Sequence, residues 1–317
     1  MLGVLCSRPK DGKPYKPARL EVTVGYRFLP SFRHFIGTVE QTERERLNNQ
    51  IRNNANLFDL SATYQLNPRW SVNASIPFVH ATRNQLYVPR GEFAVTSQGD
   101  ATAGVRAWLF KQPTESRRNI GVGLALKVPT GRYNVTGNAT DRNGIPIVAT
   151  ADQSIQPGDG GIGFVLDINA YSPTYFDSWL YFQGLYLFNP RNTNGVNSFR
   201  ARPGETVLSV SDQYLYRGGF SRAVPKIRGL AWSFGGRIEG VPVRDAFGKS
   251  DGFRRPGYAL SLDPGALYSR GNYTYSLNIP WAIERNRKKS VSDYRNRIHG
   301  DAAFADYSII FAISRRF

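Results

Sequence analysis

Three histidines, His34, His80 and His299, could exchange protons near neutral pH in this 317-residue chain. A serine hydrolase needs such a histidine beside a serine nucleophile, with a carboxylate to orient the ring. His80 lies close to Ser75 in the sequence, but Ser75 falls in the polar register of its predicted strand and no third partner is apparent. We therefore expect no catalytic residue, and a lipid hydrolase acting through His80 is the least favoured hypothesis.

Two further sequence features give little support for a functional site. The glycine-rich run 156–161 lacks the lysine and the following helix of a phosphate-binding loop. Cys6 is the only cysteine, so it can form neither an internal disulfide nor a metal site alone. We expect no bound cofactor and no metal.

Charged residues recur instead in the polar register of predicted strands, across most of the chain. Twelve are predicted to line an interior: Arg19, Glu21, Arg27, Asp59, Arg106, Lys127, Asp167, Arg217, Arg237, Glu239, Asp263 and Asp306. Burying each unpaired charge in an apolar core would cost several kcal/mol, so the interior must be water-filled or plugged by loops. Two interpretations stay open: a ladder of ion pairs that stiffens a barrel, or groups that select a solute by charge.

The element that organises these residues is the last one, 302–317. Large apolar side chains alternate there with small and polar ones, as in a strand with two different surroundings. The strand ends on Phe317, and a final strand with a C-terminal aromatic resembles the assembly signal of Gram-negative outer-membrane β-barrels. The resemblance implies contact with the barrel assembly machinery.

The same alternation predicts an all-β chain of about twelve strands. They span about 18–29, 55–66, 70–80, 99–110, 119–129, 159–171, 177–188, 207–220, 228–240, 257–268, 273–283 and 302–317. Short turns alternate with long loops, among them 31–54, 82–98 and 130–158, and 31–54 includes a segment that could form a helical turn or two. This pattern predicts a single antiparallel up-and-down transmembrane β-barrel over 18–317, with short periplasmic turns and long extracellular loops, after an extended segment 1–17. A soluble sandwich is the alternative, but it explains neither the alternating connections nor the terminal Phe.

Composition agrees with this reading. Only 41% of residues are hydrophobic and no apolar run is long enough for a transmembrane helix, whereas barrel strands average out as polar. The net charge of +17 gathers mainly in loops such as 284–299 and the 253–255 patch. We expect those loops to meet lipopolysaccharide phosphates, or to steer anionic solutes, and we expect no nucleic-acid partner. The opening 1–6 is too short for the apolar region of a signal peptide, so the export signal is not expected in this chain.

Three short motifs resemble a known family. The segments 99–109 (Gly-Asp-Ala-Thr-Ala-Gly-Val-Arg-Ala-Trp-Leu), 127–133 (Lys-Val-Pro-Thr-Gly-Arg-Tyr) and 158–160 (Gly-Asp-Gly) are similar to strands of the outer-membrane transporters of the meta-pathway phenol degradation family. The resemblance implies passive uptake of small solutes, aromatic or hydrophobic ones among them, across a bacterial outer membrane. Its alternative is a barrel without transport, serving a structural or adhesive role through its external loops.

Overall fold

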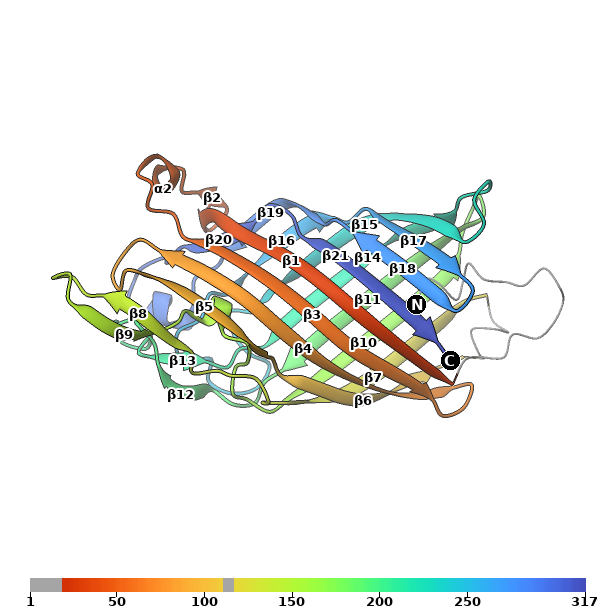
Figure 1. The fold of residues 1–317 in the computed structure, drawn as a ribbon, viewed down its shortest axis with the longest axis horizontal. Helices are drawn as coiled ribbons and strands as arrows, with labels where there is room; N and C mark the ends of the chain where they lie inside the picture. The colour runs from red at the N-terminus through yellow and green to blue at the C-terminus, as the bar shows by residue number, and fades with distance from the viewer. Residues whose placement is uncertain (1–18, 111–116) are drawn as a thin grey trace.

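The computed structural model describes residues 19–110 and 117–317, and these form one closed antiparallel barrel of twelve strands (Figure 1). The predicted extended segment 1–17, with Cys6, lies outside the described residues. In order, the barrel strands are β1 (Leu20–Ile36), β3 (Arg52–Gln65), β4 (Trp70–Gln85), β5 (Gly91–Gln98) with β6 (Ala101–Trp108), β7 (Asn119–Val128), β10 (Gly163–Pro173), β11 (Ser178–Phe188), β14 (Gln213–Ala223), β15 (Leu230–Val241), β16 (Gly257–Leu262) with β17 (Gly265–Arg270), β18 (Tyr273–Asn278) with β19 (Trp281–Arg287), and β20 (Ala302–Ala305) with β21 (Ile309–Arg316).

The last strand closes the barrel, as its sequence predicts. β21 pairs with β1 in antiparallel register, from Glu21 opposite Arg316 to Phe28 opposite Ile309. β1 pairs with β3 on its other side. The ring of pairings therefore has no open edge, which is the condition for a sheet to sit in hydrocarbon.

Three neighbouring strands are each interrupted near the same place. Prolines follow the first half of two of them, at Pro264 and Pro280, where the missing N–H breaks the ladder. The breaks support one another, because Ile279 N–H donates to the Pro264 carbonyl and Ser308 N–H donates to the Pro280 carbonyl, both at 3.1 Å. The strands thus bend at these interruptions but stay paired within the sheet.

The outer face of the barrel is apolar and exposed. Leu60, Leu124 and Phe164 keep 48%, 54% and 46% of their surface exposed, and each lies in the register opposite the charged one. A continuous apolar band of this kind around a closed barrel is the surface that lipid covers. Among the described residues, no helix is long and apolar enough to span a membrane.

The two ends of the barrel differ. One, here the turn end, holds Phe317 and the short connections; the other, the loop end, holds the longer ones (Figure 1). Small elements at the loop end are β2 (Val39–Glu40), α2 (Glu43–Arg46), β8 (Thr136–Thr140), β9 (Pro146–Thr150), the 3-10 helix η1 (Gln153–Ile155), β12 (Thr193–Asn197), β13 (Val207–Ser209) and α3 (Val291–Arg295). The helix α2 occupies the segment where the sequence suggests a helical turn.

The predicted long loop 82–98 is wrong. β4 continues to Gln85, β5 begins at Gly91, and only 86–90 connect them. The inward side chains of β5, Phe93 and Val95, are apolar because they pack against loop 129–162, in a buried cluster with Ala139 and Ile155. Connection lengths therefore do not alternate without exception, since this strand pair extends the barrel wall itself.

The predicted strand 207–220 is also divided. Its first residues form β13, which pairs with β12 in a small hairpin at the loop end, and the barrel strand begins only at Gln213. Loops at this end are thus folded elements that pack on the wall.

We expect Leu124→Arg to destabilise the membrane-inserted barrel by about 2 to 4 kcal/mol if the residue sits near the bilayer midplane, because a cation would face lipid there. The matched control is Val148→Arg, since Val148 is 72% exposed on the hairpin beyond the barrel. Reversible urea unfolding in lipid vesicles measures both. Equal small effects would contradict the assignment of the outer face to lipid.

Candidate channel lumen

An ion pair crosses the interior of the barrel. Arg27 of β1 donates from Nη2 to Glu239 Oε1 of β15 at 2.6 Å, although three barrel strands separate β1 from β15 along the shorter way around the wall. Arg237 donates to the other oxygen of Glu239 at 2.7 Å. We call these three residues the cross-lumen bridge. Because the partners come from distant strands, the bridge divides the lumen at this level.

A second ion pair passes over a single strand. Arg106 of β6 donates to Asp167 of β10 at 2.7 Å, and Gly123 of β7 lies between them in the same hydrogen-bonded row. A Cβ atom at Gly123 would come within 1.9 Å of Asp167 Oδ2. The glycine therefore leaves the space in which the two side chains meet.

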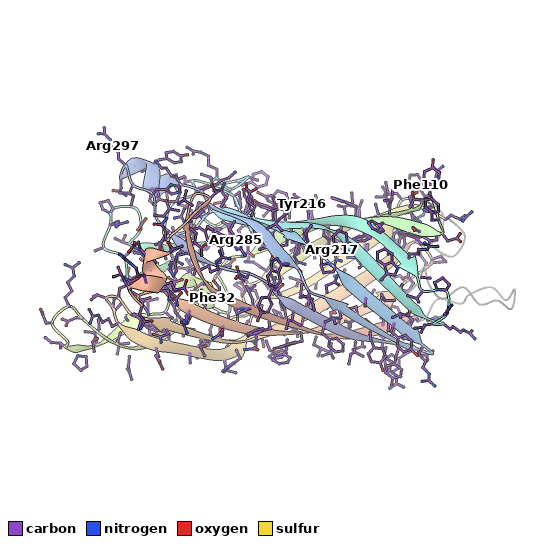
Figure 2. The ribbon with its side chains drawn as sticks, turned by 90° about the horizontal axis from the view of Figure 1, so that it is seen from above. Phe32, Phe110, Tyr216, Arg217, Arg285 and Arg297 are labelled. Atoms are coloured by element: carbon purple, nitrogen blue, oxygen red, sulfur yellow. The ribbon has the colours of Figure 1, made fainter. Side chains whose placement is uncertain are left out.

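Arg217 pairs across a strand in the same way. Its Nε lies 3.1 Å from Asp263 Oδ2, and Asp263 is fully buried. Its guanidinium also stacks on the Tyr181 ring, 5.4 Å from the centroid. Arg217 lies near the middle of the barrel and Arg285 nearer the loop end (Figure 2).

Two other predicted residues form local pairs with adjacent strands. Glu21 accepts a hydrogen bond from Arg316 at 3.1 Å across the closing seam. Asp59 accepts one from the Ser75 hydroxyl, so Ser75 is engaged on the inner face. Both contacts lie along the wall.

Asp306 and Arg19 lie towards opposite ends. Asp306 accepts from Arg33 at 2.9 Å and also from Arg285. Arg19 precedes β1 at the turn end and is exposed. Arg19 thus lies outside the barrel strands.

Lys127 belongs to a cluster in which the motifs 99–109, 127–133 and 158–160 meet. Its Nζ donates to Asp159 and lies 3.6 Å from Asp100. Asp100 accepts from the N–H groups of Gly131 and Asp159, at 3.0 and 3.1 Å, and Thr130 Oγ1 donates to the Gly99 carbonyl. We call this cluster the loop anchor, because it joins both ends of loop 129–162 to the junction of β5 and β6. These motifs therefore have a structural explanation.

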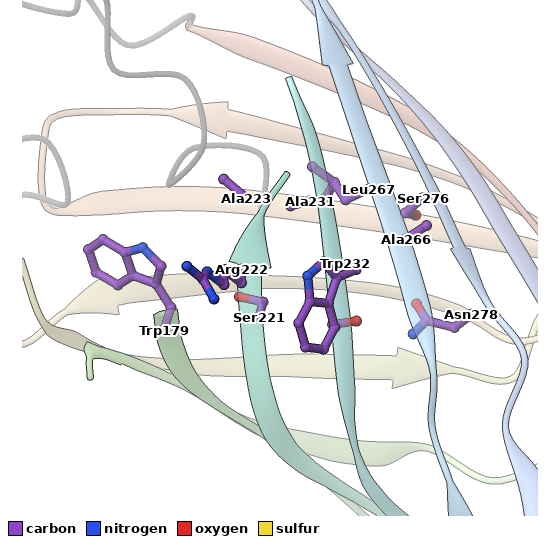
Figure 3. A pocket seen from close by; sticks show the side chains of 11 residues that line it. Trp179, Ser221, Arg222, Ala223, Ala231, Trp232, Ala266, Leu267, Ser276 and Asn278 are labelled. Carbon is purple, nitrogen blue, oxygen red and sulfur yellow. The ribbon is translucent and has the colours of Figure 1, made fainter. Parts of the chain in front are cut away.

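Towards the turn end the lumen is aromatic on one side. The rings of Trp108 and Tyr171 lie 5.8 Å apart, and those of Tyr171 and Trp179 lie 6.1 Å apart. Small side chains such as Ser221 of β14 and Ser276 of β18 line the next strands around the wall. Between them is a cavity of about 130 Å³, flanked by Trp179 (Figure 3).

Part of the lumen wall is apolar and unfilled. Leu185 shares a row with Asp167, Leu215 and Glu239, so its side chain points inward. It nevertheless keeps 38% of its surface exposed. Water or a solute can therefore reach an apolar stretch of wall between two charged groups.

The sequence did not predict a group of buried charges at the loop end. Asp152, next to η1, accepts two hydrogen bonds from Arg255, at 2.6 and 2.5 Å, and lies 3.3 Å from Arg83 of β4. Burial alone would raise the pKa of the Asp152 carboxyl, but the charges of Arg255 and Arg83 hold that pKa below its usual range. Strand alternation continued through Ala81 and Arg83 would have revealed the inward arginine.

The predicted exposure of the 253–255 patch is also wrong. Arg254 is buried and donates to Asp245 and Ser209, while Arg255 is largely buried against Asp152. In loop 284–299, Arg285 and Arg287 are likewise buried, whereas Lys288, Arg295 and Arg297 are exposed. The formal charge of this end is therefore partly neutralised by ion pairs.

The three histidines lie in separate surroundings. His34 is buried, shares a hydrogen bond with Asp301 at 2.8 Å, and accepts at Nε2 from the Ile51 N–H. His80 is exposed on the outer face against Thr96, and His299 contacts the Arg287 carbonyl. His80 and Ser75 point to opposite faces of β4.

We expect Gly123→Ala to displace Asp167 and to lower the free energy of unfolding by about 1 to 3 kcal/mol, the usual cost of overpacking. Gly236→Ala is the control, because a Cβ there meets nothing within 4 Å. Urea unfolding in vesicles compares them. A Gly123→Ala variant as stable as Gly236→Ala would show that Asp167 can move without cost.

Loop-end stability should depend on pH through Asp301. Burial would raise the pKa of its carboxyl, but the His34 hydrogen bond and the Arg44 charge lower it to about 2. Because the pKa is depressed on folding, Asp301 stabilises the loops, by about 2 kcal/mol, above its ordinary pKa, and this is lost as pH falls through about 2. Hydrogen exchange of 288–301, corrected for intrinsic rates, should lose protection between about pH 4 and 2.

Asp301→Asn should weaken that protection already at pH 7 and flatten its pH dependence. Glu43→Gln is the control, since the Glu43–Arg46 pair is mostly exposed. An unchanged acid transition in Asp301→Asn would assign the effect to other carboxylates.

Comparison with known proteins places this geometry among outer-membrane barrels. No family model matches the sequence, and no curated protein matches it. The structure is similar to the COG4313 outer membrane channel from Pseudomonas putida F1, with a TM-score of 0.67 and 12% identity over 98% of this chain and 100% of that one. It also resembles the β domain of the Bordetella autotransporter BrkA (TM-score 0.51, 12% identity, 95% and 100% covered) and a deletion mutant of the TodX monoaromatic hydrocarbon channel (0.50, 10%, 96% and 92%). At these identities the likeness concerns the fold, and the fold is that of an outer-membrane β-barrel.

Proposed function

We propose that the protein is a channel of the bacterial outer membrane for passive uptake of small, hydrophobic or aromatic solutes. The observation that carries the proposal is the unfilled lumen, in which the inward Leu185 keeps 38% of its surface exposed. A barrel that served only as a scaffold would gain stability by filling this space, because packed apolar contacts stabilise a fold.

The solute class follows from the lining. The aromatic side at Trp108, Tyr171 and Trp179 offers flat apolar contact, and Leu185 extends the apolar surface. Two of the similar structures are named as channels, one of them for monoaromatic hydrocarbons. These names describe the other proteins, and they support the proposal for the present chain.

The charged residues take two roles in this proposal. The cross-lumen bridge narrows the path and discriminates between solutes by their charge. The pairs along the wall, such as Glu21 with Arg316, stiffen the barrel. No residue is proposed to be catalytic.

The partners follow from the surfaces. Lipid covers the apolar band, and the exposed Lys288, Arg295 and Arg297 at the loop end bind lipopolysaccharide phosphates. The strand ending at Phe317 is proposed to contact the barrel assembly machinery. The loop end faces outward from the cell and the turn end faces the periplasm.

Single-channel recording in planar bilayers tests the function. We expect discrete openings of the purified protein, and a conductance at least about twofold larger in Arg27→Ala/Glu239→Ala, because that variant removes the constriction that divides the lumen. The matched control is Glu21→Ala/Arg316→Ala, whose ion pair joins adjacent strands and should leave conductance nearly unchanged.

The results separate a channel from a scaffold. If neither the wild type nor the cross-lumen variant shows openings, the barrel acts through its external loops instead. Equal conductance changes in both double variants would remove the cross-lumen bridge from its proposed role.

A further inference from the structure

A second cavity, of about 190 Å³, lies inside the loop end. Its walls come from β1, β3, β4 and β20, and from the loops that carry Ser154 and Arg255. Leu29, Ile51, Ala55 and Ala303 make one part apolar. The cavity thus lies between the barrel wall and the loops that fold onto it, where a solute coming from outside would pass.

The cavity has the size of one small ring compound. An apolar protein cavity of about 150 Å³ holds benzene. About 40 Å³ more leaves room for a substituent of a few atoms. Size therefore selects a single six-membered ring with a small group attached.

One donor in the lining makes an ion pair but no hydrogen bond. Arg83 is 2% exposed, and its Nε and Nη1 donate to Gln85 and Asn53 at 3.0 and 2.9 Å. Its Nη2 lies 3.3 Å from Asp152 but makes no hydrogen bond. Asp152 instead accepts directly from both terminal nitrogens of Arg255. A buried guanidinium nitrogen that has an ion pair but no hydrogen bond favours a further oxygen ligand, because the missing hydrogen bond costs free energy.

The charges around the cavity favour an anion. Three arginines (Arg44, Arg83 and Arg255) face two carboxylates, those of Asp152 and Asp301. His34 accepts at Nε2, so its proton is on Nδ1 and is donated to Asp301, which leaves the ring neutral. Among these five charged groups one positive charge is in excess, and a monoanion would balance it.

We propose that this cavity binds a monocyclic carboxylate, with the ring against Leu29 and Ile51 and the carboxylate accepting from Arg83 Nη2. The inference rests on the proposed function and narrows its solute class from small aromatic or hydrophobic molecules to ring acids. Binding here would concentrate the solute on the outer side of the cross-lumen bridge.

Isothermal titration of the full chain in detergent at pH 7 tests this, with benzoate as the probe. Benzamide, which has the same shape and no charge, should bind at least tenfold more weakly. Acetate, which has the charge and no ring, should also bind at least tenfold more weakly. Equal affinity for benzamide would overturn the role of charge, and equal affinity for acetate would overturn the role of the ring.

Two variants locate the site. Ala303→Phe fills the cavity and keeps every charge. Arg83→Met removes the donor that makes no hydrogen bond, while Asp152 stays paired with Arg255. Each should weaken benzoate binding at least tenfold. Ala62→Phe is the control, because Ala62 lies on the outer face of β3 and should leave affinity unchanged. Unchanged affinity in Ala303→Phe would place any benzoate site elsewhere, whether or not Arg83→Met folds.

Conductance of the same preparations separates this inference from the proposed function. Openings without benzoate binding would overturn the ring-acid site and leave the channel in place. Benzoate binding that Ala303→Phe abolishes, in a protein without openings, would support the site and contradict transport.

Discussion

A sheet in lipid cannot leave its edge unpaired, and the rest of this structure follows from that constraint. Each free N–H or C=O in hydrocarbon costs several kcal/mol, so the first and last strands must find one another. The seam between β1 and β21 satisfies this requirement over eight consecutive residue pairs. Closure then separates an outer face that lipid covers from an inner face that must be made polar, filled or wet.

The inner face meets that demand mainly with ion pairs that span strands. Arg106 reaches Asp167 over Gly123, and Arg27 reaches Glu239 across the open interior. Such contacts need small residues beneath them or space between them, so glycine and charge are arranged together. The result is a wall with fixed charges and an interior that is not completely packed.

Strand alternation predicted the barrel and its twelve strands, and it assigned the charged residues to the register opposite the apolar one. It was less informative at the loop end, where Phe93 and Val95 are apolar on the inward side because a loop packs on them. A strand whose inward residues pack on a loop is apolar on both faces, so its sequence lacks the alternation of apolar and polar residues that marks a barrel strand. The sequence also could not predict which charges pair, because the partners are far apart along the chain. Arg27 pairs with Glu239, and Asp152 pairs with Arg255.

The loop anchor has a consequence for how the protein can vary. Lys127, Asp100 and Asp159 hold the two ends of loop 129–162 at one point. The barrel strands therefore depend on the ends of this loop and not on its length. The tip between β8 and β9, at Asp141 and Gly144, projects beyond the wall and could be lengthened or exchanged with little effect on the strands. The loop end can thus diverge in sequence and length while the barrel beneath it stays the same.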